Sequence, residues 1–206
     1  MNITKHLRRR AVTWAAAGAA VVAAASALSL TAASAAPVNS ASSRPFTFAM
    51  VPSPGISSCL PHAHGSVTII PGSENDLMSV TITGMPSHAE FDLFVIEQPN
   101  KPFGVSWYQT DVDADSHGVG HASVRGIFDR ETFSVSPGGT TTFAPIHQFH
   151  LGLWFNDPQL PFKLGCEPGQ PAPVVTPFNG EQHAGIQVLN TAQFPVGAGP
   201  LSRVHR

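Results

Sequence analysis

The sequence predicts an all-β fold, an antiparallel β-sandwich of immunoglobulin-like or jelly-roll-like type with long Pro- and Gly-rich loops and one disulfide. Short runs of β-branched and aromatic residues recur along the chain, and no segment after the N-terminal leader shows a helical period. The chain holds 19 Pro and 18 Gly residues, which separate these runs. Both residue types interrupt strands and form turns, so the pattern favours many short strands over helices.

The first 35 residues predict a signal peptide. Lys5 and three arginines at 8–10 precede an Ala-rich apolar run, and small residues follow at 33–35. This order is typical of an export signal, so we expect cleavage after Ala35 and a secreted, extracellular protein without a membrane span. A retained membrane anchor is the alternative, because the apolar run is long enough to cross a bilayer. The three arginines also allow twin-arginine export.

The remaining chain is acidic and predicts a single domain. Residues 36–43 are small and polar and fit a disordered spacer, which leaves 44–206 as one β-sandwich domain. Without the four cations of the leader, the chain has seven Lys and Arg residues and thirteen Asp and Glu residues, which gives a net charge near −6. We therefore expect no nucleic-acid partner, since nucleic acids are bound by basic surfaces.

The first three predicted strands each end at a Pro- or Gly-containing turn. They are residues 44–50, 66–70 and 78–83. The first is expected at a sheet edge, the second is rich in β-branched residues, and the third alternates between apolar and polar residues.

The strand pattern is strongest at residues 90–97, with the sequence EFDLFVIE. Phe91, Leu93 and Val95 alternate on one face, and further apolar residues lie on the other. Because both faces are partly apolar, this strand is expected in the centre of the sheet.

Five further strands are predicted, and the first of them, 103–110, continues the apolar alternation. This alternation assigns Val105 and Trp107 to the core, and Trp154 is assigned there for the same reason. The other four strands are 118–128, 131–135, 146–155 and 185–190, and short helical turns fit residues 87–89 or 158–162.

Two cysteines remain after removal of the leader, Cys59 and Cys166. An even number in an exported chain predicts one disulfide, with two free thiols as the alternative. Closing a loop of roughly 100 residues is worth up to about 4–5 kcal/mol in the chain-entropy model. The bridge would tie the long loop at 156–184 to the loop around Cys59.

Three stretches carry a resemblance: FDLFVIEQPNKPFGVSWYQ, HLGLWFND and VTPFNGEQHAGIQVLN. They resemble a family of uncharacterised exported bacterial proteins from high-GC Gram-positive organisms, over roughly residues 67–201. This resemblance implies export and one domain, and it assigns no site. The sequence TITGMP at 81–86, followed by a strand, looks like the strand–turn–strand of immunoglobulin-like and fibronectin-like modules.

One acidic turn is a candidate metal site. Alternate carboxylates in a turn suit Ca²⁺, and nearby imidazoles would suit Zn²⁺ or Cu²⁺. The candidate ligands are Asp111, Asp113, Asp115, His117 and His121. The EF-hand pattern fails, because Ser116 replaces the turn glycine and Ala122 the bidentate glutamate. A solvated hairpin turn without any cofactor is the competing interpretation.

A second candidate site lies in the loop before the last strand, where Asn179, Glu181 and His183 mix amide, acid and imidazole groups. Such a mixture can bind a ligand or cap the backbone of its own loop. Aromatic residues offer a third surface, since their rings bind sugars and apolar ligands by stacking. These are Trp107, Tyr108, Trp154, Phe155, Phe162 and Phe178, although strand aromatics are more often core.

No catalytic residue is predicted. The chain contains no complete G-x-S-x-G motif, and no sequence pattern pairs its carboxylates. The sequence therefore predicts a secreted non-catalytic β-sandwich protein that binds a cell-surface, wall or extracellular partner. The alternative is an extracellular metal-binding protein or metal-dependent enzyme that uses the region 111–121.

Overall fold

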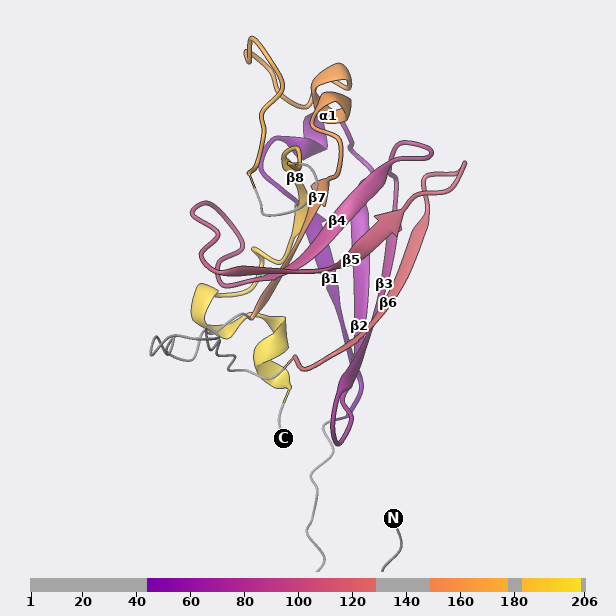
Figure 1. Cartoon of the computed structure of the whole chain (residues 1–206), viewed down its shortest axis with the longest axis vertical. Coiled ribbons are helices and arrows are strands. Elements are labelled where there is room, and N and C mark those ends of the chain that lie inside the picture. Colours follow the sequence, from indigo (N-terminus) through magenta and orange to yellow (C-terminus); the bar gives the residue numbers. More distant parts are fainter. Residues whose placement is uncertain (1–43, 129–148, 178–182, 205–206) are drawn as a thin grey trace, which may run out of the picture. The chain divides into compact units, whose positions relative to one another are not determined.

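The computed structural model describes residues 44–128, 149–177 and 183–204, all within one compact unit that spans Asn39–Arg206. These residues form an all-β antiparallel sheet of eight strands that is nearly closed, like a barrel (Figure 1). The predicted signal peptide and spacer lie outside the described residues, as does the predicted strand at 131–135.

Eight of the predicted strands are confirmed, with ends that differ by a few residues. They are β1 (Phe46–Pro52), β2 (His64–Ile70), β3 (Asp76–Thr83), β4 (Glu90–Ile96), β5 (Ser106–Asp113), β6 (Gly120–Gly126), β7 (His150–Phe155) and β8 (Gln187–Asn190). The predicted helical turn near 158–162 is α1 (Gln159–Lys163). Three 3₁₀ turns complete the described elements: η1 (Ile56–Ser58), η2 (Val196–Ala198) and η3 (Pro200–Arg203).

The strand order is β5-β4-β7-β8-β1-β2-β3-β6. β1 links the two halves of the sheet, β5-β4-β7-β8 on one side and β2-β3-β6 on the other. The first part of β1 pairs with β2, while Val51 and Pro52 pair with β8. The expectation that β1 is an edge strand was therefore wrong. The edges are β5 and β6, which meet at an isolated bridge between Ala114 and Gly120. The narrower expectation of an immunoglobulin-like or jelly-roll-like sandwich stays a prediction.

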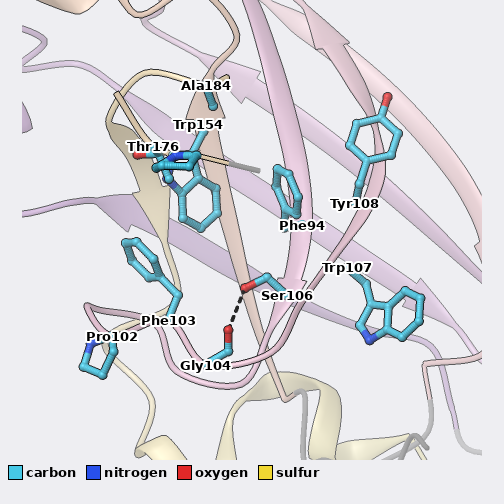
Figure 2. Close-up of a pocket in the computed structure, with 11 residues that line it drawn as sticks. Phe94, Pro102, Phe103, Gly104, Ser106, Trp107, Tyr108, Trp154, Thr176 and Ala184 are labelled. Carbon is cyan, nitrogen blue, oxygen red and sulfur yellow. Dashed lines mark hydrogen bonds between the residues drawn. The ribbon is translucent and has the colours of Figure 1, made fainter. Parts of the chain in front are cut away.

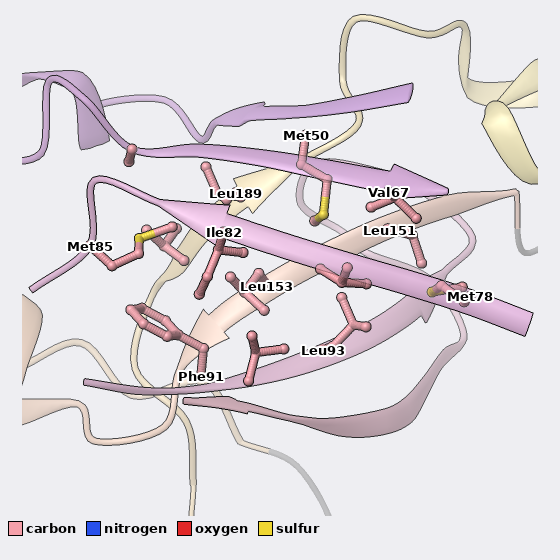
Figure 3. Close-up of a cluster of buried hydrophobic side chains, with 14 of the residues drawn as sticks. Met50, Val67, Met78, Ile82, Met85, Phe91, Leu93, Leu151, Leu153 and Leu189 are labelled. Carbon is pink, nitrogen blue, oxygen red and sulfur yellow. The ribbon is translucent and has the colours of Figure 1, made fainter. Parts of the chain in front are cut away.

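The main core lies between the two halves of the sheet (Figure 3). β4 contributes Phe91, Leu93 and Val95 to it, as the alternation predicts. The opposite face of β4 is also covered, since Phe94 and Ile96 pack in a second cluster with Trp154 and Ala184. β4 is thus a central strand with both faces buried, flanked by β5 and β7.

Two core assignments were wrong, at Val105, which directly precedes β5, and at Trp107 on β5. Val105 is 38% exposed and Trp107 is 47% exposed, whereas Trp154 on β7 is buried as expected. The physical reason is the place of β5 at the edge of the sheet, where it pairs with β4 alone. An edge strand has neighbours on one side only, so apolar alternation does not guarantee burial there.

The predicted disulfide between Cys59 and Cys166 is present, with a Cα–Cα distance of 5.1 Å and a sequence separation of 107 residues. The disulfide joins the end of η1 to the segment after α1 and so anchors residues 166–177. Several residues of this segment line the pockets described below. Within the described residues, no helix is long and apolar enough to cross a membrane.

Candidate ligand-binding site

A pocket of about 900 Å³ opens on the outer face of β4, β5 and β7 (Figure 2). Loop residues from the β4–β5 hairpin and from the segment before β8 complete its wall. Five of its eleven lining residues are aromatic: Phe94, Phe103, Trp107, Tyr108 and Trp154. The remaining lining residues are Pro102, Gly104, Ser106, Thr176, Pro177 and Ala184.

Strand register brings the aromatic rings together. Phe94 on β4 lies opposite Tyr108 on β5 and Gly152 on β7. The ring of Phe94 packs edge-to-face against Tyr108 at 5.8 Å and against Trp154 at 5.3 Å between centroids. Phe103 packs against Trp154 in the same way at 4.9 Å. Such edge-to-face contacts are favourable arrangements of aromatic quadrupoles, so the wall is one connected aromatic network.

Gly152 makes room for this network. A Cβ atom at this position would collide with the indole ring of Trp154 and with the side-chain amide of Gln187. The strand can therefore carry a large ring at Trp154 only because the residue two positions earlier lacks a side chain.

The β4–β5 hairpin holds Phe103 over Trp154. Backbone hydrogen bonds join Glu97 to Val105 and Gln98 to Phe103. The Val105 N–H also donates to the Glu97 carboxylate at 3.1 Å. Gly104 has a φ of +68° and lies against the Glu97 side chain, where a Cβ atom would collide, so glycine is required at this turn.

The pocket wall combines exposed rings with a few polar groups. Trp107 and Tyr108 are 47% and 49% exposed. The Tyr108 hydroxyl donates to Asp111 Oδ1 at 2.8 Å. Ser106 Oγ donates to the Gly104 carbonyl at 3.4 Å (Figure 2). The buried indole N–H of Trp154 has no acceptor among the described residues.

A ladder of carboxylates adjoins the pocket. Glu90 and Asp92 on β4 lie directly opposite Asp113 and Asp111 on β5. Asp92 is only 2% exposed, and its Oδ1 accepts a hydrogen bond from the Asn156 amide at 3.1 Å. Burial raises the pKa of Asp92 to about 6, with a further contribution from Asp111, while the Asn156 hydrogen bond opposes the shift. Asp92 therefore holds its proton into mildly acidic solution.

Tyr108 connects this ladder to the pocket. Burial, together with its hydrogen bond to Asp111, raises the pKa of the Tyr108 phenol to about 12. Tyr108 is consequently a neutral hydrogen-bond donor at physiological pH and points its hydroxyl toward the acids rather than into the aromatic network.

The five predicted metal ligands occupy different parts of this region. Asp111 and Asp113 belong to strand β5, since the strand continues further than the sequence suggests. One Asp115 oxygen accepts the N–H groups of His117 at 2.8 Å and Val119 at 3.0 Å. Both bonds lower the pKa of Asp115, the bond from Val119 more than the bond from His117, and both stabilise the turn.

His121 lies 3.1 Å from Thr81 Oγ1 through its Nδ1. In the part of the chain that the structure describes, no group of three or more His, Cys, Asp or Glu side chains could hold a metal ion. Metal binding by Asp111, Asp113, Asp115, His117 and His121 stays a prediction. The sequence did not reveal that Glu90 and Asp92 lie opposite Asp113 and Asp111, because this pairing depends on strand register.

The second predicted site is only partly described. Asn179 and Glu181 lie outside the described residues, and His183 is exposed next to Ala184, a residue of the pocket wall. Ligand binding by these three residues stays a prediction. Among the other aromatic candidates, Phe155 is buried in the core, Phe162 is half-buried in α1, and Phe178 lies outside the described residues.

His150 is a buried histidine that was not singled out from the sequence. Its Nδ1 lies 2.9 Å from Thr191 Oγ1, and its Nε2 lies 3.0 Å from the Val196 carbonyl oxygen. Burial lowers the pKa of His150, so the neutral ring donates from Nε2 and accepts at Nδ1. The role supported by these contacts is structural, since they fix the segment after β8.

Comparison with models of known protein families and with curated proteins gave no match to this chain. The resemblance to exported proteins of high-GC Gram-positive bacteria therefore stays an expectation from the sequence.

Proposed function

We propose that the chain is an exported, non-catalytic protein that binds a glycan of the cell wall or cell surface in the aromatic pocket. The observation that carries this proposal is the exposure of Trp107 and Tyr108 beside the buried rings of Phe94 and Trp154. Large apolar rings are normally covered, and leaving them exposed forgoes about 25 cal/mol for each Å² of apolar surface. An aromatic surface that is kept exposed at the mouth of a pocket is typical of a binding site.

The chemistry of the wall suits a neutral ligand. Among the described residues, the pocket lining includes Ser106 and Thr176, which carry hydroxyls, but no Asp, Glu, His, Lys or Arg side chain. A sugar ring offers an apolar C–H face for stacking on aromatic rings and hydroxyls for hydrogen bonds to such groups. Acid–base catalysis would instead need an ionisable group within hydrogen-bond reach of the ligand.

Export is supported by two independent features. The leader has the order of charged, apolar and small residues that a signal peptide requires. Disulfides such as Cys59–Cys166 persist mainly in oxidising compartments outside the cytosol. We also propose that the nearly closed sheet is a variant of the immunoglobulin-like or jelly-roll-like sandwich, with β1 as the strand shared by both layers.

Co-sedimentation with purified bacterial cell walls tests the proposal. The disulfide-bonded protein should sediment with the walls, and the double variant Trp107→Ala/Tyr108→Ala should lose at least tenfold in affinity. Ile127→Ala is a matched control, since Ile127 is exposed but does not line the pocket. Equal sedimentation of the double variant and the control would contradict the proposal, as would a wild-type protein that stays in solution.

A further inference from the structure

A second pocket, of about 570 Å³, lies beside the aromatic pocket and shares Phe103 and Thr176 with it. Its wall is built from segments that are distant in the sequence, at 53–55, 100–103 and 166–176, together with Ile186 and Gln187. Cys166 belongs to this wall, so the disulfide holds one side of the pocket in place.

Glu167 brings an unsatisfied carboxylate to this wall. The side chain is 8% exposed, and its Oε2 accepts the backbone N–H of Val174 at 2.8 Å. Its other oxygen, Oε1, is buried and has no donor among the described residues. A buried carboxylate oxygen without a cationic or hydrogen-bonding partner is unfavourable, because burial removes the water that would otherwise solvate it.

Gln187 brings an unsatisfied donor to the same wall. The Ala192 N–H donates to Asn190 Oδ1 at 2.9 Å, which leaves the Asn190 amino group as a donor. That group donates to Gln187 Oε1 at 3.0 Å, and Ser53 Oγ donates to the same oxygen at 2.9 Å. The network therefore fixes the orientation of the Gln187 amide. Its Nε2 is the other end of the amide; it lies against Gly152 and the ring of Trp154 and is buried without an acceptor among the described residues.

We propose that this second pocket binds a ligand that carries a protonated amine and a nearby carbonyl oxygen. The amine would donate to Glu167 Oε1, in a charge-assisted hydrogen bond, and the carbonyl would accept from Gln187 Nε2. An amino acid and the amino terminus of a peptide share this chemistry. The apolar side chains of Phe103, Val174 and Ile186 line the same pocket and suit an apolar ligand side chain.

Binding requires a small movement of the wall, since neither unsatisfied atom is exposed to solvent. Lys101 and Gln170 are long, exposed side chains of this wall. Rotations of side chains are common when a ligand or partner binds. Lys101 also places a positive charge at the rim of the pocket. This charge would attract the carboxylate of a free amino acid, whereas the corresponding group in a peptide is a neutral amide.

An NMR titration of the disulfide-bonded protein tests the proposal with three probes: leucinamide, leucine and N-acetylleucinamide. Leucinamide represents a peptide amino terminus, leucine a free amino acid, and the acetylated probe lacks the positive charge. We expect leucinamide or leucine to shift the Val174 backbone amide and the Gln187 side-chain amide, and the acetylated probe to bind at least tenfold more weakly. Tighter binding of leucine than of leucinamide would identify a free amino acid as the ligand, and the reverse order a peptide terminus.

Glu167→Gln supplies a second test, because glutamine can still accept the Val174 N–H through its oxygen but carries no charge. The variant should bind the amine probes at least tenfold more weakly, while Glu74→Gln, at an exposed loop position, should bind like the wild type. The proposal is overturned if the acetylated probe binds as well as leucinamide, or if no probe shifts these two amides. The comparison of probes on the wild type remains decisive if Glu167→Gln does not fold. These outcomes are independent of wall binding in the aromatic pocket.

Discussion

Asp92 and Asp111 face each other directly across the antiparallel strands β4 and β5. Like charges in directly opposed positions destabilise a strand pair. Each acid has a separate hydrogen-bond donor, Asn156 for Asp92 and Tyr108 for Asp111. Tyr108 also lines the aromatic pocket, so this acid pair adjoins the strand that carries the exposed rings.

Asp92→Asn should stabilise the protein at neutral pH. The pKa of Asp92 is raised from 3.8 to about 6 in the folded state, so the folded protein binds more protons than the unfolded chain between these values. Stability from this group is therefore highest near pH 4 and falls as the pH rises toward 6. Since one pKa unit corresponds to about 1.4 kcal/mol, we expect Asp92→Asn to gain roughly 1–3 kcal/mol at pH 7.

Urea unfolding of the wild type and Asp92→Asn between pH 4 and pH 7.5 measures this difference. Glu74→Gln is the control for removing one acid from an exposed position. A difference between the wild type and Asp92→Asn that is the same at pH 4 and pH 7 would show that Asp92 ionises normally.

His150 should give the opposite pH dependence. Its pKa is lowered by burial from the usual 6.5, so the unfolded chain binds more protons than the folded protein below this pH. Stability from His150 is present above pH 6.5 and is lost as the pH falls toward the lower folded pKa. His150→Gln has no ionisable group and should flatten this part of the urea-midpoint curve. An unchanged slope between pH 7 and pH 5 in His150→Gln would contradict this account.

Gly152→Ala should disrupt the aromatic network. The added methyl group would collide with Trp154 and Gln187, and extra atoms in a well-packed interior typically cost about 1–3 kcal/mol. Near-UV circular dichroism should lose part of the Trp154 signal, and urea unfolding should show the lower stability. Gly197→Ala is the matched control, because a Cβ atom there meets no other atom within 4 Å. Equal stability of the two variants would mean that the Trp154 ring is not held over Gly152.

The alternative of a metal protein has a direct test in elemental analysis and thermal unfolding. Because no group of three metal-ligating side chains converges among the described residues, we expect less than one equivalent of Ca²⁺, Zn²⁺ or Cu²⁺ after purification. EDTA should then leave the melting temperature within about 1 °C of its starting value, since a ligand that binds only the folded state would raise it. A stoichiometric metal ion, removed by EDTA with a large drop in melting temperature, would favour the metal site at 111–121.

Local patterns predicted the strands well, because a strand shows its alternation over a few residues. The burial of Phe91, Leu93 and Val95 followed from that alternation alone. The exposure of Trp107 did not, since it depends on the position of β5 at the edge of the sheet. Edge position is decided by which distant strands pair, and the sequence of one strand does not contain that information.

The candidate sites depend even more on distant contacts. The disulfide was predictable because the sequence has only two cysteines. The pairing of Asp92 with Asp111 needs strand register, and the second pocket needs Glu167 and Gln187 to reach one pocket from distant parts of the chain. Glu167 gave no signal in the sequence, because an isolated glutamate in a Pro-rich loop is normally solvated.

The central claim is that the aromatic pocket binds a wall glycan, and the indole N–H signals of Trp107 and Trp154 test it most directly. These two tryptophans are the ones that lie outside the predicted signal peptide. In an NMR titration with the tetramer of N-acetylglucosamine, the account predicts that both signals shift with one common dissociation constant. If neither signal moves under conditions in which the protein sediments with cell walls, the ligand binds elsewhere and the assignment of the pocket is wrong.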